Sequence, residues 1–419
     1  MEGNMIKFID LFAGMGGIRI GFEKAAANLN IETKSVFVSE IKKHAISAYS
    51  DNFNETIHGD ITAINAKAIP DFDILLAGFP CQAFSNAGNR LGFDDTRGTL
   101  FFDVARILKE KQPYGFILEN VEGLVSHDKG NTFRVITNVL DALEYNVSYK
   151  VLDSQNFGLA QSRKRIYIVG TKGKKVDLNS FKKKESILND VLEFDVKPID
   201  CEFSEKLLSH FSLSDVIGKQ IKDKRGGENN IHSWDFELKG EVTEDQKELL
   251  ELLLRQRRNR KWAEVIGIDW MDGMPLTKEM IETFYDNPNL EEMLEDLTKK
   301  EYLVYEHPKQ KINGRRVYDT SLEKGYNIVT GKLSFKYNRI LDGHAVTPTL
   351  VATDVSKLGV AVQDGIRPLT IREGLRLFGF PEEYKLDLPK SKAYDLLGNT
   401  VAVPVIEAIS TELLKNYKA

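Results

Sequence analysis

The sequence predicts an α/β protein in which a doubly wound sheet is joined to a second, smaller domain of mixed structure. Short apolar runs alternate with amphipathic helical patterns from the N-terminus to about Val169, which is typical of such a sheet. The first run leads into a glycine turn and a helix, the order found where doubly wound sheets bind nucleotides. The alternation then breaks, and 419 residues are too many for one compact core, so a second domain is expected.

The first strand and turn lie within residues 8–17, where an apolar run ends in Gly14, Gly16 and Gly17. Glycines there let the backbone approach a ligand that side chains would exclude. Glu40 ends the next apolar run, at the distance where such folds place a carboxylate on a ribose. The glycine spacing is not G-x-G-x-x-G, which disfavours a dinucleotide-dependent oxidoreductase. A nucleoside cofactor without a pyrophosphate fits the turn better.

Cys81 is one of only two cysteines, and it follows the apolar run of residues 74–79 directly after Pro80. Most lone cysteines are small buried hydrophobic residues. A thiol in a loop just beyond a strand is nevertheless a candidate nucleophile. The residue alone leaves both interpretations open.

The chain resembles the DNA cytosine-5 methyltransferases through six motifs that occur in the family's order. These are residues 8–17, residues 78–88 around Pro80-Cys81-Gln82, Glu119-Asn120-Val121, Gln161-Ser162-Arg163-Lys164-Arg165, residues 367–381 and Gly398-Asn399-Thr400-Val401. The resemblance covers about residues 6–171 and 345–419. One departure is Phe79, where many relatives carry a second proline. We expect that change to alter loop packing rather than chemistry.

The resemblance implies methyl transfer to carbon 5 of a cytosine through a covalent intermediate. Cys81 would attack carbon 6 of the ring, which activates carbon 5. Glu119 would hold the Watson-Crick edge and donate a proton to the ring nitrogen, a role that requires a raised pKa. Arg163 and Arg165 would contact the flipped base, its phosphate and the catalytic loop. Without the resemblance, Glu119 would be an exposed carboxylate at the end of a strand, and Arg163 and Arg165 would be solvated. Asn120 is expected to be a turn and hydrogen-bond residue that fixes the loop at Glu119.

The cofactor implied by the resemblance is S-adenosyl-L-methionine. Phe12 would pack against it, Glu40 would bind the ribose, and Asp60 would accept from the adenine amino group. The matching positions are Phe12, Ala13, Gly14, Gly16, Gly17, Glu40, Ile41, Asp60, Ile61, Leu100 and Asn399. Residues 80–98 would form a mobile flap that closes over DNA, with Gln82 and Ser85 as DNA contacts; an ordinary surface loop is the alternative.

The partner implied by the resemblance is double-stranded DNA, although the net charge of −5 argues mildly against nucleic acid. Three basic runs could offset this balance locally. Residues 161–184 contain nine lysines and arginines and one acid, residues 255–261 contain five in seven, and a third run comprises Lys309, Lys311, Arg315 and Arg316. Each run alone is typical of a solvated face, but together they could line a DNA cleft. From the second run we predict DNA contacts by Arg257, Arg258 and Arg260.

The expected domains are a catalytic and cofactor-binding domain over residues 1–176, completed by 391–419, and a target-recognition domain with a hinge over residues 177–390. In the second domain the patterns predict a helix over residues 244–258 and strands around Val317, Ile328 and Leu350. Thr370 and Glu373 form a capping-box pattern for a helix over residues 371–378. Residues 403–414 are expected to return to the first domain as a helix.

Composition narrows the cellular setting. No apolar run approaches the roughly 20 residues needed to span a bilayer, and the N-terminus is no signal peptide. Two cysteines give no disulfide framework, which indicates a reducing cytoplasm, and the histidines show no metal-ligand spacing. The enzyme is expected to act as a monomer on nucleoid DNA, with a companion restriction endonuclease. The alternatives are a tRNA-methylating relative, which the long arginine-bearing middle segment disfavours, and a non-catalytic DNA-binding relative, which the intact catalytic set disfavours.

Overall fold

The computed structural model describes residues 5–80, 100–312, 315–330, 335–363 and 365–418. These residues form two compact units. Unit 1 comprises residues 1–193, 343–356 and 369–419, and unit 2 comprises residues 194–342 and 357–368. Cys81, Gln82, Ser85 and the rest of the predicted flap after Pro80 lie outside the described residues.

Unit 1 is built on a six-stranded sheet in the order β2-β1-β3-β4-β6-β5. The strands are β1 (Ile6–Leu11), β2 (Thr33–Ser39), β3 (Ile74–Gly78), β4 (Gly115–Val121), β5 (Asn146–Asp153) and β6 (Lys164–Thr171). Neighbours β2, β1, β3 and β4 run parallel, whereas β6 is antiparallel to both β4 and β5. The predicted doubly wound α/β sheet is therefore confirmed, with one reversed strand.

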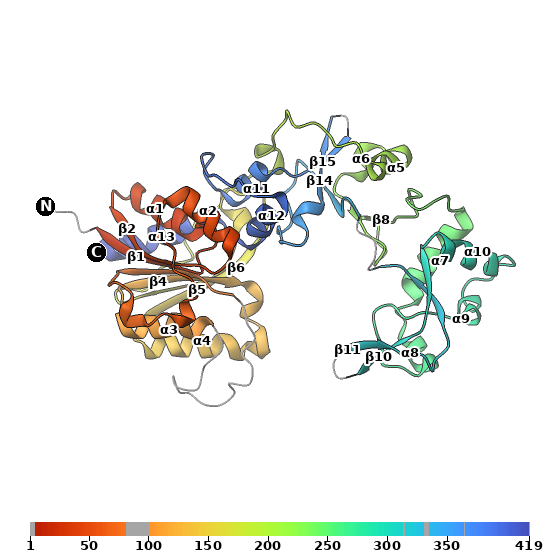
Figure 1. Cartoon of the computed structure of the whole chain (residues 1–419), viewed down its shortest axis with the longest axis horizontal. Coiled ribbons are helices and arrows are strands. Elements are labelled where there is room, and N and C mark those ends of the chain that lie inside the picture. The colour runs from red at the N-terminus through yellow and green to blue at the C-terminus, as the bar shows by residue number, and fades with distance from the viewer. Residues whose placement is uncertain (1–4, 81–99, 313–314, 331–334, 364, 419) are drawn as a thin grey trace. The chain divides into compact units, whose positions relative to one another are not determined.

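Helices cover both faces of this sheet (Figure 1). The helices of unit 1 are α1 (Gly17–Asn28), α2 (Lys43–Phe53), α3 (Leu100–Lys111), α4 (Asn131–Ala142), α11 (Ile371–Phe378), α12 (Lys390–Asn399) and α13 (Val403–Lys418). Helices α3 and α4 pack on one face of the sheet, and α1 and α13 pack on the other. Short 3-10 turns are η1 (Ile61–Ala63), η2 (Ala66–Ala68), η3 (Glu122–Leu124), η4 (His127–Gly130), η5 (Ser154–Asn156), η6 (Leu188–Asp190) and η7 (Val355–Lys357).

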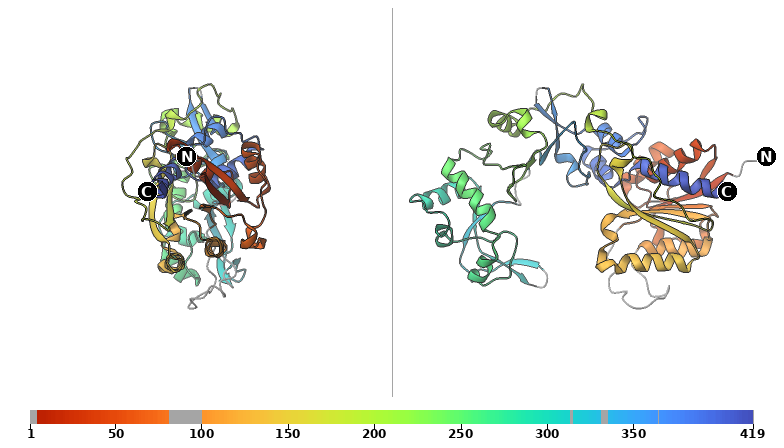
Figure 2. Two further views of the ribbon diagram at one scale, coloured as in Figure 1. Left: turned by 90° about the vertical axis from the view of Figure 1, so that its left-hand side faces the viewer. Right: turned by 180° about the vertical axis from the view of Figure 1, so that it is seen from behind.

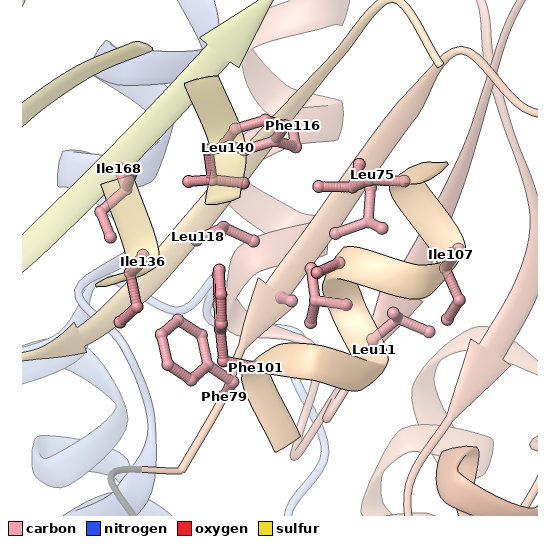
Figure 3. Packing of buried hydrophobic residues seen from close by; sticks show 14 of the residues in the cluster. Leu11, Leu75, Phe79, Phe101, Ile107, Phe116, Leu118, Ile136, Leu140 and Ile168 are labelled. Carbon is pink, nitrogen blue, oxygen red and sulfur yellow. The ribbon is translucent and has the colours of Figure 1, made fainter. Parts of the chain in front are cut away.

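Alternate strand residues enter the two cores, as the period of two requires. Leu11, Leu75 and Leu118 pack against α3 and α4, together with Phe101 and Ile136 (Figure 3). Their strand neighbours, including Phe8, Leu76 and Ile117, pack on the opposite face against side chains of α1 and α13. Figure 2 shows α13 lying along that face, so the C-terminal helix returns to the first domain as predicted and completes the core that it shares with α1.

The same C-terminal stretch is apolar enough to be tested as a membrane span. By length and mean hydropathy, residues Lys390–Tyr417 could cross a bilayer, but 67% of the most apolar part of this stretch is buried inside the protein. Within it, Val405, Ile406 and Ile409 are fully buried against the sheet. Its hydropathy is thus explained by its place in the core.

Unit 1 also holds segments that the sequence assigned to the second domain. Leu188 N–H donates to the Ala345 carbonyl at 3.0 Å, and the Gln161 side-chain amide donates to the Leu377 carbonyl at 3.0 Å. These bonds group residues 177–193, 343–356 and 369–390 with the sheet, unlike the expected limits of 177 and 390. The assignment of target recognition to residues 177–390 stays a prediction. Helix α11 has the predicted capping box at Thr370 and Glu373.

Unit 2 contains a five-stranded mixed sheet and a helical part. The sheet has the order β15-β14-β13-β7-β8, from β7 (Gln220–Ile221), β8 (Asn230–Ile231), β13 (Arg339–Leu341), β14 (Leu358–Val362) and β15 (Gly365–Pro368). The helices are α5 (Glu202–His210), α6 (Leu213–Val216), α7 (Glu244–Gln256), α8 (Arg260–Ile266), α9 (Lys278–Glu282) and α10 (Leu290–Lys299). Two antiparallel pairs join β9 (Leu303–Glu306) to β12 (Gly325–Ile328) and β10 (Lys309–Ile312) to β11 (Arg315–Tyr318).

The secondary-structure predictions for unit 2 are mostly confirmed. Helix α7 begins as predicted at Glu244 behind a Thr243 cap and ends two residues earlier than expected. Val317 and Ile328 lie in strands β11 and β12. The strand predicted around Leu350 is wrong. Leu350 is fully buried in unit 1, and its carbonyl accepts a side-chain bond from Arg163 instead of a ladder bond.

Contact between α1 and α13 depends on a glycine. An added Cβ at Gly21 would lie 2.7 Å from Cβ of Ile406 and 2.8 Å from the Val403 carbonyl oxygen. We therefore expect Gly21→Ala to lower the free energy of unfolding by about 1–3 kcal/mol, measured by chemical denaturation. The control is Gly123→Ala, where nothing lies within 4 Å of the added atom. Equal stability of the two variants would contradict this packing.

Candidate active site

A cavity of about 710 Å³ opens in unit 1 at the carboxyl ends of β1, β2, β3 and β4. It brings together every predicted site residue of unit 1 that the structure describes, except Gly16. These lining residues are Phe12, Ala13, Gly14, Gly17, Glu40, Ile41, Asp60, Ile61, Leu100, Glu119, Arg163, Arg165 and Asn399. The sheet topology explains the gathering, because parallel strands end at one edge.

The turn after β1 has the backbone conformation that glycine favours. Gly14 and Gly16 have positive φ angles of 54° and 83°, and Phe12 shares the left-handed conformation with φ 54°. A Cβ at Gly16 would lie 2.4 Å from the Phe53 ring, so Gly16 allows the turn to pack on α2 rather than lining the cavity itself. Left-handed backbone at a non-glycine residue is costly and often marks a functional site. Here it accompanies the placement of Phe12 at the cavity wall.

Glu40 joins this turn to the end of β2. Its Oε2 accepts from the Gly14 N–H at 2.8 Å, and its Oε1 accepts from the N–H groups of Ile41 and Lys42, both at 2.8 Å. A carboxylate offers about four acceptor positions, so one remains for a ligand hydroxyl. Beside it, Ile41 is 68% exposed although it is apolar and lines the cavity. Such an exposed aliphatic side chain offers a surface on which a planar ring can pack.

Asp60 and Asn399 close the cavity from other segments. Asp60 Oδ1 accepts from the Thr62 N–H and hydroxyl at 2.9 and 2.8 Å. The Thr62 backbone bond and then its side-chain bond lower the pKa of Asp60, so the carboxylate stays ionised and can accept from a ligand amine. The Asn399 side chain donates to the Asp395 carbonyl oxygen at 2.8 Å and remains exposed at the cavity wall.

Glu119 is a buried acid at the end of β4. Only 8% of the residue is exposed, and Arg165 Nε lies 3.3 Å from its Oε1. Burial raises the pKa of Glu119, while the positive charges of Arg165 and Arg163 act in the opposite direction. The net direction is upward, as an acid that must carry a proton requires. The prediction of a buried, perturbed carboxyl is thus met in the structure, in place of an exposed strand-end carboxylate.

Arg163 and Arg165 both line the cavity, on either side of Lys164. Arg163 is 3% exposed and donates to the carbonyls of Leu350 and Gly398 at 3.0 and 3.2 Å. Burial lowers the pKa of Arg163 to about 10, and neighbouring Arg165 adds to this effect. These arginines are therefore not a solvated pair. Arg163 ties two distant segments to the cavity wall, and Arg165 faces the acid.

Asn120 fixes the chain just before the candidate nucleophile. Its side-chain amide donates to the Phe79 carbonyl at 2.8 Å and its carbonyl oxygen accepts from the Val121 N–H at 2.8 Å. Phe79 is buried against the Phe101 ring, and Phe79 and Pro80 line the cavity, so the described chain leads to Cys81 from the cavity wall. Asn120 therefore makes hydrogen bonds as predicted, but it lies within strand β4 and not in a turn.

Sequence reasoning did not identify a polar cluster behind the glycine turn. Asp10 is 1% exposed, the Tyr49 hydroxyl donates to its Oδ2 at 3.3 Å, and Arg19 Nη1 donates to that hydroxyl at 3.1 Å. Burial raises the pKa of Asp10 to about 7. The available signal was an aspartate inside the apolar run of β1. The sequence analysis also did not identify Asp395, whose Oδ2 lies 2.9 Å from Lys42 Nζ and 2.6 Å from His44 Nε2 beside the cavity.

The predicted DNA contacts in unit 2 have unequal surroundings. Arg257 is 3% exposed, and its guanidinium donates to Asn327 Oδ1 at 2.9 Å inside unit 2. The prediction that Arg257 contacts a DNA phosphate at the surface is therefore corrected. Arg258 is paired with Asp272 at 2.7 Å. Arg260 is exposed, with its guanidinium carbon 5.9 Å from the Trp270 ring centre. The sequence run alone did not distinguish these environments.

Together, the sheet and cavity define an α/β protein in which a glycine turn, a buried acid and two arginines surround one cavity. Comparison with known proteins gives the family. Residues 6–415 match the C-5 cytosine-specific DNA methylases, and the chain belongs to this family. It is thus a DNA (cytosine-5)-methyltransferase, as the sequence predicted.

Individual relatives match almost the whole chain. Type II methyltransferase M.NlaIV of Neisseria lactamica is 58% identical and M.NgoBV of Neisseria gonorrhoeae 57% identical, each covering 98% of this chain and 99% of the relative. Among solved structures, the S. pombe Dnmt2 methyltransferase has a TM-score of 0.56 at 16% identity, covering 99% of this chain and 100% of that one. At that identity the structural likeness supports the fold.

The pKa of Glu119 predicts a pH-dependent stability difference. Because the folded-state pKa is raised above the unfolded value, ionisation costs the parent stability as pH rises from the unfolded pKa through the folded one. Glu119→Gln cannot ionise. We therefore expect its unfolding free energy, relative to the parent, to increase as pH rises through that window, measured by urea denaturation at several pH values. A relative stability that falls over this range would show that the arginines dominate over burial.

Proposed function

We propose that this enzyme is the modification methyltransferase of a type II restriction-modification system and that the cavity binds S-adenosyl-L-methionine. In this proposal the methyl acceptor is a cytosine flipped out of a specific double-stranded DNA sequence. The observation that carries the proposal is a single cavity that joins the glycine turn and Glu40 to the buried pair of Glu119 and Arg165. Cofactor and base can therefore meet in one cavity.

The cavity residues fit the parts of this cofactor. Phe12 and the exposed side chain of Ile41 offer apolar surface to the adenosine portion. Glu40 keeps an acceptor position for a ribose hydroxyl, and Asp60 for the adenine amino group. When bound, the cofactor supplies an electrophilic methyl group. The remaining assignments are Ala13, Gly14, Gly17, Ile61, Leu100 and Asn399 as lining residues, with Gly16 shaping the turn from behind.

The chemistry proposed for the base uses residues of this chain. The Cys81 thiolate adds to carbon 6, and Glu119 donates its proton to the ring nitrogen as negative charge develops there. Carbon 5 would then take up the methyl group as the bond between this methyl group and the cofactor sulfur breaks. Water would remove the carbon 5 proton, the thiolate would leave carbon 6, and the ring nitrogen would return its proton to Glu119, so that the ring recovers its aromaticity. Arg165, beside Glu119, is suited to the base carbonyl. Arg163, which donates to two backbone carbonyls, acts by holding the wall.

Other parts of the proposal concern DNA and the cell. Gln82 and Ser85 would contact DNA beside the flipped base, and residues of unit 2 would read the target sequence. From the basic run of residues 255–261 we retain Arg258 and Arg260 as phosphate contacts, because Arg257 is buried. The protein would act as a monomer on DNA in the cytoplasm, and a companion restriction endonuclease would cut the same unmethylated sequence.

The Asp60 assignment can be tested with little disturbance of the fold. Asp60→Asn retains the oxygen that accepts from Thr62 but replaces the acceptor proposed for the adenine amino group. We expect S-adenosyl-L-methionine to bind roughly tenfold more weakly, measured by calorimetry, because a hydrogen bond to a charged group contributes about 1.5–3 kcal/mol. The matched control is Asp177→Asn, an exposed aspartate that also accepts from turn groups outside the cavity. Equal affinities in both variants would exclude the contact.

The covalent step can be tested by trapping. If the carbon 5 hydrogen must leave before the thiolate, fluorine at carbon 5 should prevent release of the enzyme. DNA with 5-fluorocytosine at a methylated site should then form, only with S-adenosyl-L-methionine, a complex that survives denaturing electrophoresis. Peptide mapping should place the adduct on Cys81, and Cys81→Ala should form none. An adduct on Cys201, or no adduct at a site that the enzyme demonstrably methylates, would refute the mechanism.

A further inference from the structure

Unit 2 carries a two-stranded arm that ends in an exposed hairpin. Strands β9 and β12 pair at the base, and β10 and β11 pair beyond them, linked by an Asp319 N–H bond to the Pro308 carbonyl at 2.8 Å. Figure 1 and the right-hand view of Figure 2 show β10 and β11 as a ribbon at the end of this part of the chain. Residues 313–314 between these strands are outside the description, so the inference concerns residues 309–312 and 315–318.

The base of the arm is held firmly. Leu303 and Ile328 are buried in the helical core, at 1% and 2% exposure. Asn327 accepts from Arg257 and donates to Glu306 Oε1 at 2.9 Å, which connects both strands of the base to the run that follows α7. Arg257 is therefore a positioning residue for the arm. A rigid base allows the exposed end to present its side chains in a fixed geometry.

The exposed end carries an arrangement that is unfavourable by itself. Lys311 and Arg316 lie directly opposite each other across the β10–β11 ladder, and like charges in that position destabilise a strand pair. Ile312 and Val317 are 55% and 48% exposed. Among the residues that the structure describes, no acid lies within ion-pair distance of Lys311, Arg315 or Arg316. An anionic partner would remove the repulsion, and an isolated hairpin is marginally stable without added contacts.

The charge partners of the hairpin differ from those of the basic run of residues 255–261. Arg257 is committed to Asn327, and Arg258 is paired with Asp272. At the base of the hairpin, Lys309 and Tyr318 are held near Glu306, since the Tyr318 hydroxyl donates to Glu306 Oε2 at 2.6 Å and Lys309 Nζ lies 3.7 Å from it. Toward its end the cations have no such acid. Within the β10–β11 hairpin, the positive charge available to a polyanion is therefore concentrated on Lys311, Arg315 and Arg316.

We infer that the β10–β11 hairpin enters the major groove of the DNA substrate and contributes to target selection; this rests on the proposed function. The major groove, about 12 Å wide, admits a two-stranded β-ribbon. Ladder pairing places Ile312, Arg315 and Val317 on one face and Lys311 and Arg316 on the other. The first face carries the groups that read bases, since Arg pairs with guanine and aliphatic groups contact the thymine methyl. Lys311 and Arg316 contact phosphates of the groove walls.

The proposed phosphate contacts of Lys311 and Arg316 are tested with the full-length enzyme. The substrate is a DNA duplex that contains a site methylated by the parent enzyme, as identified by bisulfite sequencing. Lys311→Gln with Arg316→Gln should reduce the salt slope of binding by about two units, roughly 0.9 per lost contact. The control, Lys247→Gln with Lys278→Gln, makes the same change in net charge at lysines paired with Glu244 and Glu291 in the same unit. Equal slopes for the test and control variants would overturn the inference.

The groove part is tested by site selection. Arg315→Gln with Ile312→Ala should relax discrimination between the target and single-base variants of it by roughly tenfold at one or more positions. The measurement is bisulfite sequencing of a randomised plasmid library, after thermal unfolding has verified that the variant is folded. Unchanged selection would overturn insertion into the groove. A parent enzyme that methylates no cytosine would instead contradict the proposed function, so the two failures are distinguishable.

Discussion

The buried guanidinium of Arg163 is the contact on which the candidate active site depends. It lies at the start of β6 and donates to carbonyls near residues 350 and 398, which are far from it in sequence. Gly398, Asn399 and Thr400 line the cavity. Without this contact the C-terminal segments would lose one of their fixed points on the sheet. The two carbonyls accept from its Nη1 and Nη2, and the Phe378 ring lies 5.2 Å from its guanidinium carbon, which offsets part of the cost of burying the charge.

Around this anchor the site balances two opposing electrostatic effects. Burial disfavours the charged form of Glu119, and the two arginines favour it. If Glu119 were exposed to water, it would be an ordinary ionised carboxylate. A closer and better-aligned ion pair with Arg165 would also keep Glu119 ionised. The 3.3 Å separation and the burial together leave the pKa raised. A raised pKa lets Glu119 keep its proton to a higher pH than an ordinary carboxyl does, which suits the proposed step.

Unit 2 shows how residues of one type can serve different purposes. Arg257 fastens the base of the arm, Arg258 pairs with Asp272, and the cations near the end of the β10–β11 hairpin have no acidic partner among the described residues. An enzyme with a net charge of −5 can thus bind a polyanion if its positive charge is concentrated where the substrate arrives. The overall charge does not decide this, because its acids are distributed over other surfaces.

Much of the fold and site could be predicted from local sequence. Apolar runs, the glycine turn and the Thr370 capping box specify their elements because backbone and side-chain preferences act over a few residues. The motifs of the family located Glu40, Glu119 and Arg163 in the chain. Only the tertiary structure decided that Glu119 is buried, that Leu350 lies outside a strand and that Arg257 points inward. Burial and charge partners depend on segments tens to hundreds of residues apart, and no local pattern records which of them will meet.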